Sequence, residues 1–347
     1  MNNKMNALND ESKKIRWGII GTGRIAHLFA EALQEVHNAE LTAVASRTMD
    51  KAVTFAETFH IPKSYESYEA LVNDPEIDVV YIATPHHLHE ENTIMALNHR
   101  KHVLCEKPMG VNLKESTRMI ETARAKNLFL MEALWSRFLP HIIKIKELVD
   151  QGEIGEIQLM TVFFSFRSPN GPQHRHFNID LCGGSLLDIG IYNLFLSLYV
   201  LGEPKSMAAV AALSEQGVDQ SLGVTFGYDH KALSVMYSSF MADSTAVAEI
   251  HGSKGKIVLD HRWFLPGDVR VIYHDGRTTT HHFEVKKSGY ELEAQEVVNC
   301  ILAQRTQSEK WSWDDSMRLM RTMDVIRQQT GIVYPGHDDV VSPEKVK

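Results

Sequence analysis

The chain has 347 residues, of which 44% are hydrophobic and 23% are charged, close to the average for soluble globular proteins. Its 44 acidic residues exceed its 36 lysines and arginines, and the formal net charge of -8 argues against a general nucleic-acid or anionic-membrane binder, which needs a basic face. This length is too great for one small core and predicts two domains.

The cysteines and the apolar runs indicate the cellular compartment of the protein. Three distant cysteines form neither a disulfide framework nor a zinc motif and suit a reducing cytoplasm: Cys105, Cys182 and Cys300. The polar residues 1–16 hold no apolar run of signal-peptide length, and the apolar run at 185–201 is interrupted by polar side chains, as in a buried core helix. We therefore expect a cytoplasmic protein that binds neither a membrane nor nucleic acid.

In the first half of the chain, short apolar runs alternate with helical patterns, which is the signature of a parallel α/β sheet. Strands are predicted near residues 16–20, 41–46, 79–83, 102–105 and 129–132. Helices are predicted near residues 25–36, 50–59, 89–98, 113–126 and 140–150. This part predicts an α/β domain at residues 12–137.

From residue 156 on, the alternation of strand and helix patterns gives way to a series of β-rich runs. A β-rich run at 157–166 and a helix at 184–201 are followed by seven β-rich runs, joined by short polar turns without helices between them. These runs lie near residues 207–214, 223–228, 232–240, 245–251, 256–260, 269–273 and 278–285. With closing helices near 290–304 and 313–330, the pattern predicts an α+β domain at residues 138–347 with a mostly antiparallel sheet.

A glycine-rich turn, Gly21-Thr22-Gly23-Arg24-Ile25-Ala26, follows the first predicted strand and opens the first predicted helix. Gly21 permits the tight turn, Gly23 lets the backbone approach a pyrophosphate, and the small Ala26 allows the helix to pack closely on the strand. The helix N-terminus supplies free N–H groups and a partial positive charge to the diphosphate. Because the second strand also falls where a βαβ unit requires it, the turn predicts a dinucleotide site.

The end of the second predicted strand indicates which dinucleotide binds. NAD sites usually place an Asp or Glu about 20 residues beyond the glycines, where it holds the ribose 2′-hydroxyl. This chain has Ser46, Arg47 and Thr48 there and no acid before Asp50. The planar fork of Arg47 can pair with a 2′-phosphate, so NADP is expected, with NAD as the alternative if Arg47 merely faces solvent.

Two further stretches carry chemistry. Lys107, in Cys105-Glu106-Lys107-Pro108, follows the predicted fourth strand at the edge where ligands of open α/β sheets bind. Asp188 and Tyr192 lie four residues apart on the predicted helix and share one face. Oxidation of a carbinol needs a base for the hydroxyl proton while the cofactor takes the hydride. We expect Tyr192 as the acid/base, with its pKa lowered by Lys107, and Asp188 as the group that orients the substrate or the lysine; a surface lysine and a core tyrosine are the alternatives.

These motifs, together with Thr84-Pro85, resemble the large family of glucose–fructose oxidoreductase and inositol 2-dehydrogenase over roughly residues 15–335. Tyr192, where many members carry His, and the stretch at 132–138 are similar to a narrower branch that contains dimeric dihydrodiol dehydrogenase, also described as an NADP-dependent D-xylose 1-dehydrogenase. The resemblance implies a Rossmann domain, a domain with an open-faced sheet, NADP and, in this branch, a homodimer. One departure is Cys182, which stands where the first of three glycines is common.

Further contacts follow from the turn and from the resemblance. Besides the glycines, Ser46, Arg47 and Lys107, cofactor contacts are expected at Thr22, Arg24, Ile25, Thr84, Pro85, His89 and Glu106. Substrate contacts are expected at the domain junction and in the loop before the glycines at 183–184, from Trp135, Arg137, Phe138, Arg175 and His176. Packing of the hinge and a solvated loop are the alternatives. No metal is expected, because the histidines near residue 86 lack further ligands at a fitting spacing.

We therefore expect an NADP-dependent oxidoreductase that transfers hydride at a hydroxyl-bearing carbon of a sugar such as D-xylose, or of a trans-dihydrodiol. The alternatives are another sugar or inositol dehydrogenase, a keto-sugar reductase working in the opposite direction and, outside enzymes, a dinucleotide-sensing regulatory protein on the same fold. The strands after residue 207 are more than two helices can cover on both faces, so a homodimer through that sheet is expected.

Overall fold

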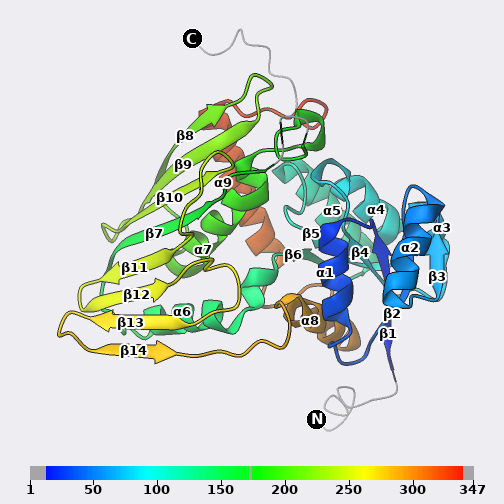
Figure 1. Cartoon of the computed structure of the whole chain (residues 1–347), viewed down its shortest axis with the longest axis horizontal. Coiled ribbons are helices and arrows are strands. Elements are labelled where there is room, and N and C mark those ends of the chain that lie inside the picture. The colour runs from blue at the N-terminus through cyan, green and yellow to red at the C-terminus, as the bar shows by residue number, and fades with distance from the viewer. Residues whose placement is uncertain (1–12, 170, 172–173, 339–347) are drawn as a thin grey trace. The chain divides into compact units, whose positions relative to one another are not determined.

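The computed structural model describes residues 13–169, 171 and 174–338, and the chain divides into two compact units (Figure 1). The first unit comprises the chain up to Gly110, Lys114–Ile142 and Glu284–Met317, and the second comprises Val111–Leu113, Ile143–Phe283 and the chain from Arg318 on. The domain limits at 12–137 and 138–347 stay a prediction, and residues 12 and 347 lie outside the described residues. The segment Glu284–Met317, assigned by sequence to the second domain, belongs to the first unit because its helix α8 (Tyr290–Leu302) packs against α1 (Arg24–Leu33).

The first unit is built on a parallel six-stranded sheet in the order β3-β2-β1-β4-β5-β6. Its strands are β1 (Ile15–Ile20), β2 (Ala39–Ala45), β3 (Lys63–Tyr65), β4 (Val79–Ile82), β5 (His102–Glu106) and β6 (Leu130–Ala133). The α-helices along this half of the chain are α1, α2 (Met49–Phe59), α3 (Tyr68–Asn73), α4 (His89–Asn98), α5 (Leu113–Lys126) and α6 (Pro140–Asp150). Strands β4 and β6 are buried at every position, as expected for a sheet covered on both faces. This strand order is that of the Rossmann fold, and the predicted class is confirmed.

The strand order reverses between β1 and β4, and in such sheets ligands bind at this point, outside the carboxyl ends of the strands. The backbone holds the two loops here: the Gly21 N–H donates to the Ala45 oxygen at 3.0 Å, and the Ala83 N–H donates to the Ile20 oxygen at 2.8 Å. The loops after β1, β2, β4 and β5 therefore surround one edge, and they carry the residues expected to bind the cofactor.

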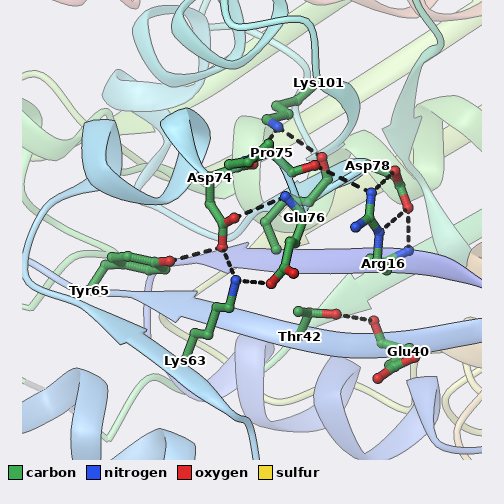
Figure 2. A network of polar contacts seen from close by, with 11 residues as sticks. Arg16, Glu40, Thr42, Lys63, Tyr65, Asp74, Pro75, Glu76, Asp78 and Lys101 are labelled. Carbon is green, nitrogen blue, oxygen red and sulfur yellow. Dashed lines mark hydrogen bonds and ion pairs between the residues drawn. The ribbon is translucent and has the colours of Figure 1, made fainter.

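A polar network lies at the opposite, amino-terminal edge of this sheet (Figure 2). The ammonium group of Lys101, just before β5, donates to the backbone oxygens of Asp74 at 2.6 Å and Ile77 at 2.8 Å. Arg16 of β1 donates to Asp78, just before β4, through Nε at 3.0 Å and Nη2 at 2.8 Å. This network holds the loop between α3 and β4 against the sheet and leaves the carboxyl edge to the ligand.

The second unit is built on an eight-stranded sheet in the order β14-β13-β12-β11-β7-β10-β9-β8 (Figure 1). Its strands are β7 (Ile157–Ser165), β8 (Ser206–Leu213), β9 (Asp219–Gly227), β10 (Leu233–Ser239), β11 (Ala248–Gly252), β12 (Gly255–Leu259), β13 (Val269–Tyr273) and β14 (Thr278–His281). Strands β7 and β10 run parallel, and the other neighbouring pairs are antiparallel, which confirms the expected mostly antiparallel sheet. Helix α7 (Ile191–Leu201) packs on β7 and β10, and α9 (Trp313–Thr330) runs from the first unit into the second.

One helical stretch of the described chain, Ile179–Leu201, is long and apolar enough to cross a bilayer. Most of its apolar window is buried inside the structure, as in the core helix of a soluble protein. Every residue of α7 except Tyr199 and Leu201 is buried. The predicted core helix is therefore confirmed, with one difference: its first turn, Leu186–Gly190, is a π-helix.

Candidate active site

The glycine turn joins β1 to α1. Gly21 has a φ of +101°, and a Cβ at this position would lie 2.6 Å from the carbonyl oxygen of Ala83, so only glycine fits. Gly23 is the N-cap of α1, and a Cβ there would meet no heavy atom of the described residues within 4 Å. The space at the helix N-terminus is therefore open to a pyrophosphate. Contacts of Thr22, Arg24 and Ile25 with the cofactor stay predictions.

The end of β2 offers a cation and a hydroxyl. Ser46 is buried, and its hydroxyl lies 3.4 Å from that of Thr22 in the glycine turn. Arg47 is exposed and forms no ion pair with any described residue. Burial raises the pKa of Tyr68, and the positive charge of Arg47 opposes this rise, which places Arg47 near Tyr68. An exposed guanidinium beside the turn, with no acid at this strand end, fits the 2′-phosphate of NADP.

His89 joins the loop after β4 to the loop after β5. It is fully buried, and its ring nitrogens lie 2.9 Å from the Thr84 oxygen and 2.7 Å from the Pro108 oxygen. Burial lowers the pKa of His89, and the two carbonyl oxygens oppose this effect. Thr84 in turn accepts a hydrogen bond from Asn92 at 3.2 Å. His89 therefore acts on the loops through hydrogen bonds, and direct cofactor contacts of Thr84, Pro85 and His89 stay predictions.

Lys107 lies on a loop that is backed by buried acids. Glu106 accepts a hydrogen bond from the Tyr81 hydroxyl and another, of 3.2 Å, from the Lys107 N–H. Glu293 of α8 is fully buried, and its two carboxyl oxygens accept no hydrogen bond from a described residue. Burial, reinforced by the charge of Glu106, raises the pKa of Glu293 well above its usual range. Burial thus favours the protonated form of Glu293, which lies behind the loop that carries Lys107.

The turn after β6 carries three of the residues expected to contact the substrate. Trp135 and Phe138 are buried, and Arg137 is partly exposed. The Trp135 ring stacks on Tyr290 of α8, with the ring centroids 4.6 Å apart, and a Cβ at Gly289 would lie 3.3 Å from the Trp135 ring. Packing within the first unit thus accounts for the Trp135 ring. Substrate contacts of Trp135, Arg137 and Phe138 stay predictions.

In the second unit, the structure brings Asp188 together with both residues predicted from the preceding loop. Arg175 Nη2 lies 3.1 Å and His176 Nε2 lies 3.5 Å from Asp188 Oδ2. The other ring nitrogen of His176 lies 3.0 Å from the Ser168 hydroxyl. The His176 ring stacks on the Phe240 ring, with the two ring centroids 4.4 Å apart. A carboxylate, a guanidinium and an imidazole therefore meet at the turn that leads to Tyr192.

Tyr192 is buried next to an aromatic pair. Phe164 of β7 and Phe264 stack with their ring centroids 3.8 Å apart, and the Tyr192 ring lies 5.8 Å from Phe164 and 6.0 Å from Phe264. These phenylalanines were not predicted as site residues. The alternating apolar pattern of residues 157–166 indicated a strand but not which side chains would reach the helix.

Other groups around the predicted residues were also missed: Tyr81, Tyr290 and Glu293 in the first unit, and Asp219 in the second. They come from strands and helices distant in the chain, and no motif in the sequence singles them out. Lys107 belongs to the first unit and Tyr192 to the second, so their pairing stays a prediction. Within the described ranges no group of three or more His, Cys, Asp or Glu side chains is arranged to hold a metal.

Comparisons with known proteins agree with this geometry. Residues 15–134 match the family model of the "Oxidoreductase family, NAD-binding Rossmann fold", and residues 142–258 match that of the "GFO/IDH/MocA C-terminal domain". The chain is 36% identical to the trans-1,2-dihydrobenzene-1,2-diol dehydrogenase of Danio rerio, with 92% of this chain and 98% of the relative covered. The chain belongs to the GFO/IDH/MocA family. It is an NAD(P)-dependent oxidoreductase, and the predicted family is confirmed.

Other relatives of this GFO/IDH/MocA protein are also dehydrogenases. It is 35% identical to the scyllo-inositol 2-dehydrogenase (NADP(+)) of Bacillus subtilis, with 92% of the chain and 98% of the relative covered. It is 34% identical to the D-xylose 1-dehydrogenase (NADP(+)) of Hypocrea jecorina, with 92% and 93% covered. These names confirm the predicted class of enzyme and of cofactor.

Solved structures share the fold over nearly the whole chain. The aldose-aldose oxidoreductase of Caulobacter crescentus has a TM-score of 0.84 at 26% identity, with 92% of this chain and 98% of that chain covered. A 3-ketoreductase of Actinomadura kijaniata, in complex with NADP and TDP-benzene, has a TM-score of 0.82 at 27% identity and the same coverage.

Proposed function

We propose that this GFO/IDH/MocA protein uses NADP to oxidise a hydroxyl-bearing carbon of a sugar such as D-xylose, or of a trans-dihydrodiol. The observation that carries this proposal is the meeting of Asp188 with Arg175 and His176, next to Tyr192 in the chain. Such a set offers an acid/base together with donors and an acceptor for the hydroxyls of a small substrate. The bound cofactor supplies hydride transfer.

The residues of the chain move the proton. Tyr192 takes the proton of the substrate hydroxyl, and Asp188, held by Arg175 and His176, orients the substrate or Lys107. A tyrosine ordinarily titrates near ~10, so its pKa must fall by about three units, or about 4 kcal/mol, to work near neutrality. An ammonium group at ~4 Å supplies about 4 kcal/mol at an effective dielectric constant of about 20. An ammonium group at this distance is therefore sufficient in magnitude for the role that we propose for Lys107.

The cofactor proposal rests on the end of β2. Arg47, with the hydroxyls of Ser46 and Thr22 beside it, takes the 2′-phosphate, and the open space at Gly23 takes the pyrophosphate. NADP appears in the names of the inositol and xylose dehydrogenases and in the structure of the 3-ketoreductase. For these two reasons we propose that the protein prefers NADP to NAD.

One second function has a specific observation in its favour. The likeness to the 3-ketoreductase supports reduction of a keto-sugar, in which Tyr192 donates the proton that it removes in the oxidation. The same residues serve both directions, so the assay runs with NADP and with NADPH.

Oligomerisation is part of the proposal. One face of the large sheet carries a row of cross-strand partners that runs from Val210 through Gly223 and Tyr237 to Phe163. Val210 is 77% and Tyr237 is 38% exposed. A sheet face with exposed apolar side chains fits association with a second copy of this face, which a two-fold axis makes self-complementary. We propose a homodimer through this face, in the cytoplasm.

The test is turnover by purified protein and its Tyr192→Phe variant, with NADP and NAD, on D-xylose, D-glucose, an inositol and a trans-dihydrodiol. Loss of the acid/base is expected to lower kcat by about 10²–10⁴-fold while the Kd for NADP stays unchanged. Tyr273→Phe, which removes a phenol from β13 outside the proposed site, is the matched control. Full kcat in Tyr192→Phe would remove the acid/base assignment, and tighter binding of NAD than of NADP would remove the cofactor assignment.

A further inference from the structure

A buried acid lies under the turn that leads to Tyr192. Asp219, the first residue of β9, is fully buried. Its Oδ2 accepts a 2.7 Å hydrogen bond from the Leu186 N–H and a 2.8 Å hydrogen bond from the Ser185 hydroxyl. Leu186 opens the π-helical turn Leu186–Gly190, so the carboxylate caps the start of the turn that contains Asp188.

The glycines of this turn let the acid approach. Gly184 has a φ of +123°, and a Cβ there would lie 2.1 Å from Asp219 Oδ1 and 3.1 Å from the Tyr334 hydroxyl. The Tyr334 hydroxyl donates to the Gly183 oxygen at 2.8 Å. The two glycines therefore serve the contact of the turn with Asp219 and Tyr334, and any side chain at position 184 would displace the carboxylate.

The serines hold the other side of the turn. The Ser185 hydroxyl lies 3.0 Å from that of Ser238 in β10, and a Cβ at Gly190 would lie 3.0 Å from the same Ser238 oxygen. Asp219 and Ser238 of the sheet thus contact both ends of the turn Leu186–Gly190, together with Ser185 just before it. π-Helical turns are often found at functional sites, and this one ends two residues before Tyr192.

Burial and hydrogen bonding have opposite effects on the pKa of Asp219. Burial raises its pKa to about 7, against the hydrogen bonds from Ser185 and Leu186, which lower it. The titratable and charged groups on this side are Tyr334, Arg327, Cys182 and Asp338. Arg327 lies over the Tyr334 ring, 4.8 Å from its centroid, and Asp338 accepts a 2.7 Å hydrogen bond from the Tyr334 N–H. Burial and the charge of Asp219 raise the pKa of Tyr334 well above its usual range, so Tyr334 stays neutral.

Ionisation decides how well Asp219 holds the turn. An ionised carboxylate accepts from both the Leu186 N–H and the Ser185 hydroxyl, and hydrogen bonds to a charged acceptor are the stronger kind. A protonated carboxyl is a weaker acceptor and adds a donor of its own. We propose that Asp219 is a positioning residue of the active site: its ionised form holds the turn that sets Asp188 and Tyr192, and its protonation slows the reaction. This inference rests on the proposed function, because it takes Tyr192 as the acid/base.

The first test compares pH profiles of the wild type and Asp219→Asn, which keeps the shape and removes the charge. The ratio of the wild-type kcat to the variant kcat is expected to rise from about 1 at about pH 5.5 to about 10 at about pH 8.5, because small displacements of catalytic groups are costly. The Kd for NADP should not change, since the proposed cofactor residues belong to the first unit. Asp229→Asn, which removes an exposed carboxylate, is the control and should keep a ratio near 1 throughout. A ratio that does not vary with pH overturns the proposal.

A second variant covers the case in which Asp219→Asn does not fold. Ser185→Ala keeps the acid but removes one hydrogen bond that lowers its pKa, so the midpoint of the kcat profile should move to higher pH. An unmoved midpoint in a folded Ser185→Ala protein contradicts the proposal.

A third measurement needs no turnover. With tyrosine labelled at the ring carbon that bears the hydroxyl, the Tyr192 resonance, assigned through Tyr192→Phe, should shift with a midpoint near 7 in the wild type. The pH midpoint of this shift should be higher in Ser185→Ala. In Asp219→Asn the Tyr192 resonance should show no such shift with pH. If the whole substrate panel fails, the proposed function fails while this titration still tests the coupling. If turnover is found but the Tyr192 resonance does not follow Asp219, the inference fails alone.

Discussion

Single side chains at the end of β2 bear on cofactor choice. Arg47 is an exposed cation at the point where NAD-specific sites carry an acid. Arg47→Ala is expected to weaken NADP binding by about 1.5–3 kcal/mol, or about 10–100-fold in Kd, and to leave the Kd for NAD nearly unchanged, because only NADP carries the 2′-phosphate. Fluorescence titration of both cofactors measures this. Lys14→Ala, an exposed cation at the amino edge of the sheet, is the control. Equal losses for NADP and NAD would show that Arg47 does not read the 2′-phosphate.

Asp219 also sets a pH dependence of stability. Burial raises its folded-state pKa to about 7, so the folded protein binds a proton that the unfolded chain releases near pH ~4. Its contribution to stability is therefore complete below pH ~4 and is lost as the pH rises to about 7. Between about pH 5 and about pH 8 the free energy of unfolding should fall by about 3 kcal/mol more in the wild type than in Asp219→Asn. Urea unfolding across this range measures the difference, and parallel curves would assign Asp219 an ordinary pKa.

At the scale of elements, two groups of polar residues lie at opposite ends of the strands in the first unit. The predicted cofactor residues lie at the carboxyl ends, and residues that hold the fold lie at the amino ends. The carboxyl ends carry the glycine turn, Arg47 and Lys107, and the amino ends carry the partly buried polar network of Figure 2. In that network Lys101 is 6% exposed and donates to two backbone oxygens of the loop between α3 and β4. We therefore expect the polar groups at the two edges of this sheet to differ in role, with cofactor binding at the carboxyl edge and stability at the amino edge.

This separation gives a prediction. Lys101→Met leaves two buried carbonyl oxygens without their donor and should lower the free energy of unfolding by about 2–4 kcal/mol. The Kd for NADP should stay within about twofold, because the loops at the carboxyl edge keep their backbone hydrogen bonds. Denaturant unfolding and cofactor titration on one preparation measure both. Lys14→Met is the matched control, and a large loss of NADP affinity at unchanged stability would contradict this division.

At the scale of the whole molecule, the open face of the large sheet predicts the assembly. Val210→Lys places a charge in the proposed dimer interface, where an unpaired charge costs about 2–5 kcal/mol, and should yield monomers in sedimentation at concentrations where the wild type is a dimer. Val333→Lys, at an exposed valine outside the sheet, is the control and should leave the dimer intact. A wild-type protein that sediments as a monomer at every concentration would rule out this interface.

Much of the fold could be predicted because it depends on local patterns. Apolar runs that alternate with helical patterns marked β1, β2, β4, β5 and β6, and closely spaced β-rich runs marked the second sheet. The edge strand β3, Lys63–Tyr65, was missed because three half-buried residues carry no periodic pattern. The segment with α8 was predicted in the second domain, whereas it lies in the first compact unit. Its position after the antiparallel strands does not indicate the surface on which its apolar side packs.

The sequence by itself determined the motifs on which the predicted chemistry rests: the glycine turn, Arg47 without a neighbouring acid, Lys107 after a strand, and Asp188 with Tyr192. Each of these is a short motif whose meaning rests on residue type and spacing. Only the tertiary structure decided the surroundings of these residues. It set Arg175 and His176 on Asp188, Glu293 near Glu106, and Asp219 under the turn before Tyr192, because burial and pairing depend on side chains that are distant in the chain and meet only after folding.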